Sequence, residues 1–152
     1  PAERKYTSAS RSDIASFYIR EGDFFYSRGN TPELVALAAI AGPIQESVVF
    51  PDLLTRVVFD PKKVIPEFAV YLFNSTYGRA YFGKVPQGAS PSMVKVSQDY
   101  MGEFPVPFMG DLSAQERVVT VAREHITALE AIDRLYAAAK EQVQRILSET
   151  WG

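Results

Sequence analysis

The chain has 152 residues, of which 47% are hydrophobic and 22% are charged, and its formal net charge is −2. This composition is typical of a folded domain with one sizeable core and excludes a disordered segment, and the overall charge gives no sign of a nucleic-acid partner. Cysteine is absent and His125 is the one histidine, which excludes disulfides, a thiolate zinc site and a Cys/His nucleophile pair.

The N-terminal segment, residues 1–12, is polar and lacks the pattern of a signal peptide. The sequence starts at proline rather than methionine, and we expect that the N-terminal part of the domain is missing. No apolar run approaches the roughly 20 residues that span a bilayer. We therefore expect a cytoplasmic protein without a membrane segment and without a metal site.

Residues 1–110 are predicted to form one domain of mixed α and β structure. Gly22 and Asp23 indicate a turn, and the aromatic run after them is typical of a strand. Strands are predicted at residues 24–27, 35–40, 47–50, 53–59 and 94–96. Helices are predicted at residues 66–73, 76–82 and 98–101. Pro66 suits the first turn of a helix, where its missing N–H costs nothing.

The chain changes character at residues 108–112. All ten prolines precede this point, and neither glycine nor proline follows it until Gly152. Ser113 and Glu116 have the spacing of a capping box, so a second unit, a helix over residues 113–151, is predicted to begin there. At about 1.5 Å per residue, residues 113–150 would span about 57 Å.

Apolar residues recur along this helix at alternating spacings of four and three, as in a coiled coil. We call them the seam: Val118, Ala122, His125, Leu129, Ile132, Tyr136, Ala139, Val143 and Ile146. A helix this long cannot bury the seam against a small domain alone, so it is predicted to pair with another helix. The alternative is a helix folded back on its own core. His125 is interpreted as a packing residue of the seam rather than a ligand.

Sequence motifs of enzymes are absent. The chain has no P-loop and no Asn/Asp-Pro-Pro-aromatic motif of adenine methyltransferases. It also lacks the alternating strands and helices, with a glycine-rich loop after the first strand, of a dinucleotide- or methyl-donor-binding fold. Asp52, Asp60 and Lys62 imitate the acid, acid and lysine order of metal-dependent nucleases. Pro61 opposes a central strand there, so a turn is the better interpretation. We expect no catalytic residue.

Two segments carry candidate DNA contacts. Residues 74–98 contain no acidic residue and three cations, and residues 27–33 offer an arginine, an amide and a hydroxyl within one turn. Such side chains bind phosphates and base edges, although both segments are also compatible with ordinary surface loops. The candidates are Arg28, Asn30, Thr31, Tyr77, Arg79, Lys84, Gln87, Ser90, Ser92 and Lys95. The cations suit phosphates or guanine, and Asn30, Gln87, Ser90 and Ser92 suit base edges.

The order of several segments resembles one family. These are SRGNTPELV (27–35), PDLLTR (51–56), GASPSM (88–93), FPVP (104–107) and the pair Gln115-Glu116 that opens the helix. Together they resemble the specificity subunits of type I restriction-modification systems. Ala36 departs from the family, which has glycine there, and the recognition part is shorter than usual.

The resemblance implies that residues 1–110 are a target-recognition domain that binds double-stranded DNA and reads one half of a split target. It implies that the helix pairs antiparallel with a second such helix and docks modification subunits. Those subunits bind S-adenosylmethionine and methylate adenine, and a restriction subunit can join them. This chain itself needs no cofactor. With one domain and one helix, it is expected to form a two-fold homodimer that reads a symmetric target.

Two alternatives stay open from the sequence. The chain could be the C-terminal specificity domain of a fused adenine-N6 DNA methyltransferase. It could instead be a coiled-coil dimerisation or adaptor module that does not bind DNA. In the second case the helix would carry the function, and the globular part would only cap it.

Overall fold

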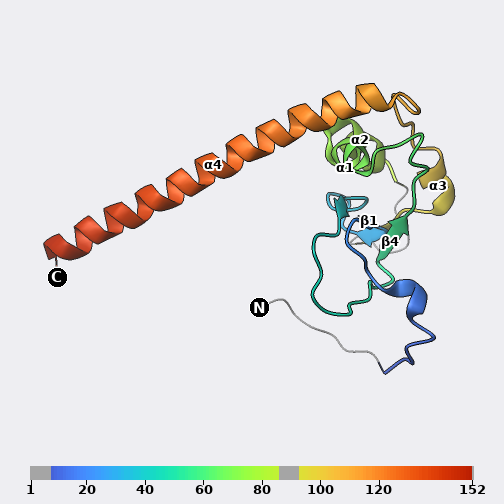
Figure 1. The fold of residues 1–152 in the computed structure, drawn as a ribbon, viewed down its shortest axis with the longest axis horizontal. Helices are drawn as coiled ribbons and strands as arrows, with labels where there is room; N and C mark the ends of the chain where they lie inside the picture. The colour runs from blue at the N-terminus through green and yellow to red at the C-terminus, as the bar shows by residue number, and fades with distance from the viewer. Residues whose placement is uncertain (1–7, 86–92, 152) are drawn as a thin grey trace.

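The computed structural model describes residues 8–85 and 93–151. Its elements are η1 (Ala15–Phe17), β1 (Phe24–Ser27), β2 (Gly29–Asn30), β3 (Ala38–Ile40), β4 (Leu54–Val57), α1 (Pro66–Asn74), α2 (Thr76–Phe82), β5 (Val94–Lys95), α3 (Gln98–Gly102) and α4 (Leu112–Trp151). All elements before α4 form a small globular part, which we call the head, and α4 projects away from it (Figure 1). This confirms the predicted mixed α and β fold followed by a long C-terminal helix.

Two antiparallel sheets form the frame of the head. In the first, β1 lies between β3 and β4, and Phe25 pairs with Ala39 on one side and with Arg56 on the other. All four residues of β1 are buried, as expected for a central strand rich in aromatic residues. In the second sheet, β2 pairs with β5, so that Gly29 lies opposite Lys95.

Four of the five predicted strands are present, three of them in shorter form, and the fifth is wrong. The strands predicted at 24–27, 53–59 and 94–96 are present, the last two in shorter form. The strand predicted at 35–40 is shorter, because Ala36 has a left-handed backbone (φ 58) that ends a turn before β3 begins. The strand predicted at 47–50 is wrong, because Val49 forms only an isolated bridge with Tyr18.

The three short helices lie where the sequence predicts them. Pro66 is the first residue of α1, and the hydroxyls of Ser75 and Ser97 cap α2 and α3 by accepting a backbone N–H three residues later. At the end of α1, the side-chain amide of Asn74 exchanges two hydrogen bonds of 2.9 Å with the backbone of Ala38. Asn74 therefore fixes α1 on the edge of the first sheet.

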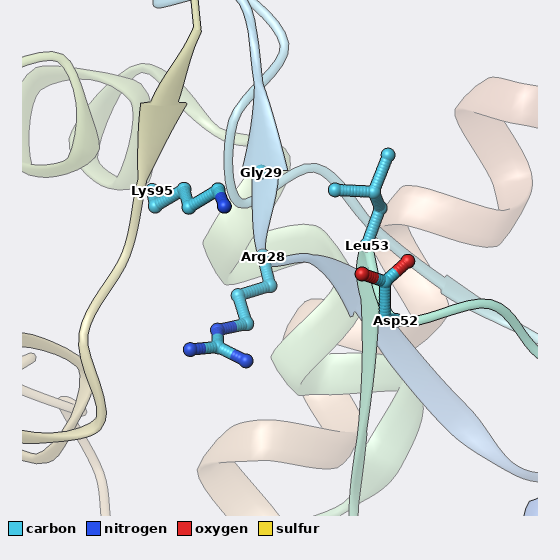
Figure 2. A pocket seen from close by; sticks show the side chains of 5 residues that line it. All are labelled: Arg28, Gly29, Asp52, Leu53 and Lys95. Carbon is cyan, nitrogen blue, oxygen red and sulfur yellow. The ribbon is translucent and has the colours of Figure 1, made fainter. Parts of the chain in front are cut away.

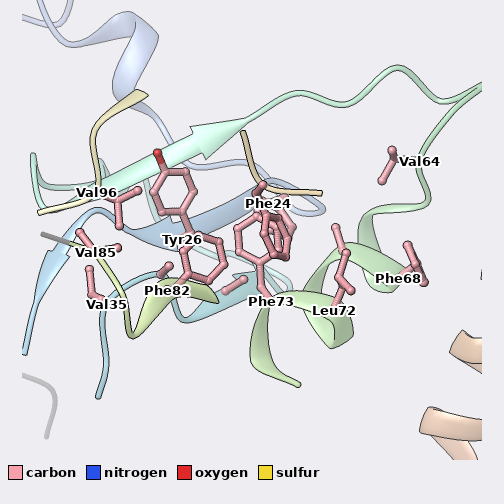
Figure 3. Packing of buried hydrophobic residues seen from close by; sticks show 14 of the residues in the cluster. Phe24, Tyr26, Val35, Val64, Phe68, Leu72, Phe73, Phe82, Val85 and Val96 are labelled. Carbon is pink, nitrogen blue, oxygen red and sulfur yellow. The ribbon is translucent and has the colours of Figure 1, made fainter. Parts of the chain in front are cut away.

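Aromatic side chains fill the core between β1 and the helices (Figure 3). The ring of Phe73 lies at the centre, with ring centroids of Phe24, Tyr26, Phe82 and Phe104 at 5.5, 6.2, 5.2 and 5.0 Å. Full burial of such a side chain contributes about 1.5–3 kcal/mol. Since these rings come from distant segments, the aromatic cluster holds the strands and short helices together.

The long helix begins one residue earlier than predicted, and its cap is a different residue. The carboxylate of Asp111 accepts the backbone N–H of Ala114 at 2.9 Å, whereas the Ser113 hydroxyl accepts a hydrogen bond from the Arg117 guanidinium. Asp111 is thus the cap in place of Ser113, and its charge also suits the positive end of the helix dipole. With 40 residues, α4 is about 60 Å long.

Only the first part of α4 packs on the head, and it does so against α1. Ala114, Gln115 and Val119 are buried. From residue 124 to residue 150, every side chain except that of Ala131 is exposed. The alternative in which the helix folds back along its own core is therefore wrong, and most of the helix extends beyond the head (Figure 1).

Candidate nucleic-acid interface

Two of the cations predicted to contact DNA, Arg28 and Lys95, line one pocket at the small sheet of β2 and β5 (Figure 2). Arg28 directly precedes β2, and its backbone carbonyl accepts the N–H of Val96 at 2.9 Å. Lys95 lies opposite Gly29 in the same sheet, and both cationic side chains are exposed. The pairing of β2 with β5 therefore joins the two segments in which the sequence placed DNA contacts.

Gly29 allows this close approach. A Cβ atom at this position would lie 3.2 Å from Cδ2 of Leu53, which requires a small shift of that side chain, and 3.4 Å from Cγ of Lys95, which is ordinary van der Waals contact. Glycine within a strand often marks such an approach. A larger residue at position 29 would first press on the Leu53 side chain.

Asp52 and Leu53 complete the pocket, which has a volume of about 50 Å³. Small-molecule sites usually have roughly 300–1,000 Å³, so this pocket suits a surface contact with a single group rather than a metabolite. Within the residues that the structure describes, neither Arg28 nor Lys95 forms an ion pair. Both cations can thus contact an anionic ligand, with the Asp52 carboxylate in the same pocket opposing part of that attraction.

Asn30 and Thr31 extend from this pair into the turn after β2. The side-chain oxygen of Asn30 accepts the N–H of Thr31 at 2.9 Å. The pKa of the Glu33 carboxyl is lowered, first by a backbone hydrogen bond at Glu33 and then by the Thr31 hydroxyl. Because Glu33 is charged and would repel a phosphate beside Thr31, this turn suits base edges better than phosphates.

Arg79 departs from the predicted site. Its guanidinium donates to the backbone carbonyl of Val35 and lies over the ring of Phe82, with Cζ 6.0 Å from the ring centroid. Burial lowers the pKa of Arg79, and Nη1 is buried without a hydrogen-bond partner among the described residues. The side chain joins α2 to the turn before β3, so we correct the prediction and leave Arg79 out of the interface.

The tyrosines of α2 serve mainly in packing. The Tyr77 hydroxyl donates to the carbonyl of Pro105 at 3.0 Å, and the side chain is 46% exposed. The hydroxyls of Tyr81 and Tyr100 each donate to the other residue's backbone carbonyl at 2.9 Å. Of the two α2 tyrosines, Tyr77 is the more exposed and thus the better candidate for a ligand contact.

The remaining predicted contacts belong to the loop after α2. Lys84 is exposed in the turn that follows α2. Gln87, Ser90 and Ser92 lie outside the described residues. The predicted polar loop is thus represented in the structure by Lys84 at one end and Lys95 near the other.

The seam of α4 is exposed. Leu129 is 62% exposed, Ile132 59% and Tyr136 75%. Val118, His125, Ala139, Val143 and Ile146 are exposed as well, and Ala122 is half-buried. Val119, beside the seam, is the apolar residue of α4 that joins the core. Exposed apolar residues gathered along one side of a helix often mark an interaction site.

The geometry does not favour a nuclease. Asp52 and Asp60 lie beyond opposite ends of β4, and a strand of four residues alone spans about 13 Å. The Asp60 carboxylate accepts the N–H of Lys62 at 2.9 Å, as in an ordinary turn. Among residues 8–85 and 93–151, no group of three or more His, Asp or Glu side chains could hold a metal ion.

The sequence prediction missed two polar residues that fix the head. The Arg56 guanidinium donates to the carbonyls of Tyr18 and Ser16 and forms a 3.2 Å ion pair with Asp23, which anchors the segment before β1. Gln115 is fully buried at the start of α4. Both occur in segments that carry the family resemblance, but only the tertiary contacts reveal what they bind.

No helix in the described part of the chain has the length and apolar character needed to cross a membrane. No protein-family model matches the chain, and no curated protein matches it.

Proposed function

We propose that the chain is a DNA-recognition subunit in which the head binds double-stranded DNA and α4 joins it to a second copy. The observation that carries the proposal is the exposed seam on a helix that leaves the head. Residues 124–151 extend beyond the docked part by about 42 Å. A helix of this length, paired with its twin, is suited to hold two heads at a fixed separation.

The chemistry of α4 supports pairing with a second copy. The seam repeats every seven residues, which matches the packing of one helix into another. Glu130 and Arg134 form an i,i+4 ion pair of 4.0 Å on the outer side of the helix, where it stays in water when the seam is covered. The same apolar surface on each copy meets the requirement of a two-fold interface.

The chemistry of the head supports a DNA contact. Arg28 and Lys95 present two exposed cations at one surface pocket, neither of them in an ion pair within the described part of the chain, and such side chains neutralise phosphates. Asn30 lies directly after Gly29 on the same strand, and an amide side chain can bond to adenine. The pair of cations would thus position the head, and Asn30 would contact a base edge.

The backbone at Ala36 also supports the family resemblance. Members of that family have glycine at this position, and here the φ angle of Ala36 is 58°. A left-handed backbone is least strained for glycine and costs roughly 1–2 kcal/mol for other residues. The backbone at position 36 is therefore left-handed, the conformation that the family's glycine would favour.

We infer that the chain belongs to a type I restriction-modification complex as its specificity subunit. It would be non-catalytic and would direct modification subunits, which bind S-adenosylmethionine, to adenines in a split target. A restriction subunit could join the same complex. The fused adenine-N6 methyltransferase differs only in carrying the catalytic domain on the same polypeptide, so the roles of the head and α4 would be unchanged.

Fluorescence anisotropy with a labelled 30-base-pair duplex of random sequence tests DNA binding by the head. Arg28→Ala with Lys95→Ala should weaken binding, and the slope of log affinity against log salt should fall by up to about 1.8, since each phosphate contact contributes about 0.9. The control variant, Lys62→Ala with Arg145→Ala, removes the same charge from exposed positions elsewhere. Its slope of log affinity against log salt should stay close to that of the unaltered chain.

Equal slopes in the two double variants would reject the site. If the unaltered chain binds no duplex even at low salt, with the modification subunits present, the proposed function fails. A dimer that persists in that case would favour the adaptor alternative, because the exposed seam is the one feature that both functions use.

A further inference from the structure

Gln115 lies at the base of α4 and is fully buried, with 0% exposure. Its carbonyl oxygen accepts the backbone N–H of Ile65 at 2.8 Å. Its amide group donates to the carbonyl of Lys63 at 2.7 Å and to that of Phe108 at 2.8 Å. Both ends of the side-chain amide are thus bonded to backbone in two different segments of the head.

These two segments meet where α4 leaves the head. Ile65 directly precedes α1, and the carbonyl of Lys63 also accepts the N–H of Gly110 at 2.9 Å. Phe108 has a left-handed backbone with a φ angle of 56°, which an ordinary residue adopts only when its surroundings hold it there. Gln115 therefore bonds to the start of α1 and to the strained connection before α4.

We propose that Gln115 is a positioning residue that fixes the direction in which α4 leaves the head. A buried amide is unfavourable unless every group is bonded, and its hydrogen bonds have directions, unlike apolar contacts. Val119 adds apolar packing and Arg123 an exposed ion pair with Glu67. Neither contact restricts the angle of the helix as three directional hydrogen bonds do.

The consequence for DNA rests on the proposed function. A head of about 100 residues has a radius of gyration of about 13 Å, so a tilt of about 20° at the base of α4 moves DNA-binding residues by about 4.5 Å. This exceeds the rise of one base pair, about 3.4 Å. A fixed Gln115 geometry would therefore set the spacing between the two half-targets to within about one base pair.

Spin labels test the geometry without DNA. The chain has no cysteine, so Glu103→Cys on the head and Glu141→Cys on the outer side of α4 provide one labelled pair, both at exposed positions. Pulsed electron paramagnetic resonance measures the distance between the two labels. The labelled chain is diluted with unlabelled chain so that both labels belong to one copy, and it should give one narrow distance distribution. Gln115→Leu should broaden it clearly, and Gln144→Leu, an exposed control in the same helix, should not.

A second variant separates positioning from folding. Gln115→Glu keeps the acceptor for the Ile65 N–H, and because burial favours the protonated carboxyl, it keeps one donor in place of two, so it should broaden the distribution to an intermediate degree. Near-ultraviolet circular dichroism of the aromatic core reports whether the head remains folded. Unchanged distributions in both variants, or unfolded heads in both, would overturn the positioning role.

The effect on DNA is measured by selecting the duplexes that bind from a pool with randomised half-targets and spacers of different lengths. Sequencing the selected duplexes gives the preferred spacer length. The unaltered chain should select one spacer length, and Gln115→Leu should accept additional neighbouring lengths. An unchanged spacer preference despite a broadened distance distribution would overturn the consequence for DNA. If the distribution broadens but no chain binds DNA, the proposed function fails while the role of Gln115 in fixing α4 stands.

Discussion

Replacing Leu129 and Ile132 with glutamate should prevent the proposed pairing of two copies through α4 and leave a monomer. Both residues belong to the seam, at 62% and 59% exposure, in the part of α4 that extends beyond the head. Neither contributes to the core cluster of the head. The substitutions should therefore leave the fold of the head intact while placing two charges in the helix interface.

The magnitude follows from the exposed apolar surface. Full burial of such a side chain contributes about 1.5–3 kcal/mol, so pairing would recover about 1–2 kcal/mol from each of these partly exposed residues. Over both copies, the double variant removes about 4–8 kcal/mol. At 1.4 kcal/mol for each tenfold change, dimerisation should weaken by at least about 10³-fold.

Sedimentation equilibrium of the full chain measures this change directly. The matched control is Thr127→Glu with Gln144→Glu, which adds the same charge to exposed positions outside the seam and should leave the dimer in place. Pairing through the seam would be refuted if the seam variant formed a dimer of unchanged affinity. It would also be refuted if the unaltered chain were a monomer at about 100 µM, since a dissociation constant of that size corresponds to a binding free energy of only about 5.5 kcal/mol.

Two further predictions concern the stability of the head and its junction with α4. The pKa values of Tyr81 and Tyr100 are raised above their ordinary value of 10.0, chiefly by burial, so the folded state retains these protons longer and its stability should fall as pH rises above about 10. The free energy of unfolding in urea, measured as a function of pH, should fall less in the double variant Tyr81→Phe, Tyr100→Phe than in the unaltered chain. An equal fall in both would contradict the raised pKa values of these tyrosines as the cause. Asp111→Ala removes the cap of α4 and should cost about 1 kcal/mol in the same assay, while Ser113→Ala should change stability by less than about 0.5 kcal/mol. Equal effects would contradict the assignment of Asp111 as the cap.

The features that the sequence predicted are those with local causes. Pro66 marks the start of a helix because its fixed φ suits that position, and the spacing of apolar residues along α4 follows from the helical repeat alone. The run at 24–27 forms the central strand because its aromatic side chains favour a buried sheet. Each of these signals is complete within a few neighbouring residues.

The features that the sequence missed depend on distant contacts. The direction of the Arg79 side chain is set by the carbonyl of Val35, which no spacing in the sequence places near it. The pairing of β2 with β5 involves strands of two residues each, too short for a recognisable period. Ser113 has the correct spacing for a cap, but Asp111, two residues earlier, reaches the same turn with a charged oxygen.

The charge of the head explains why dimerisation would matter for DNA binding. Residues 1–110 carry 11 acidic and 11 basic residues, so a single head has no strong overall attraction to DNA and, under the proposed function, would depend on a few local cations such as Arg28 and Lys95. Two weak heads joined by a stiff helix pair can bind with far higher affinity than either alone, because the second contact becomes intramolecular. The monomeric Leu129→Glu, Ile132→Glu variant should therefore lose much of its affinity for a split target, although no residue of the head has changed. Unaltered affinity in that variant would mean that one head alone binds DNA and that α4 serves another purpose.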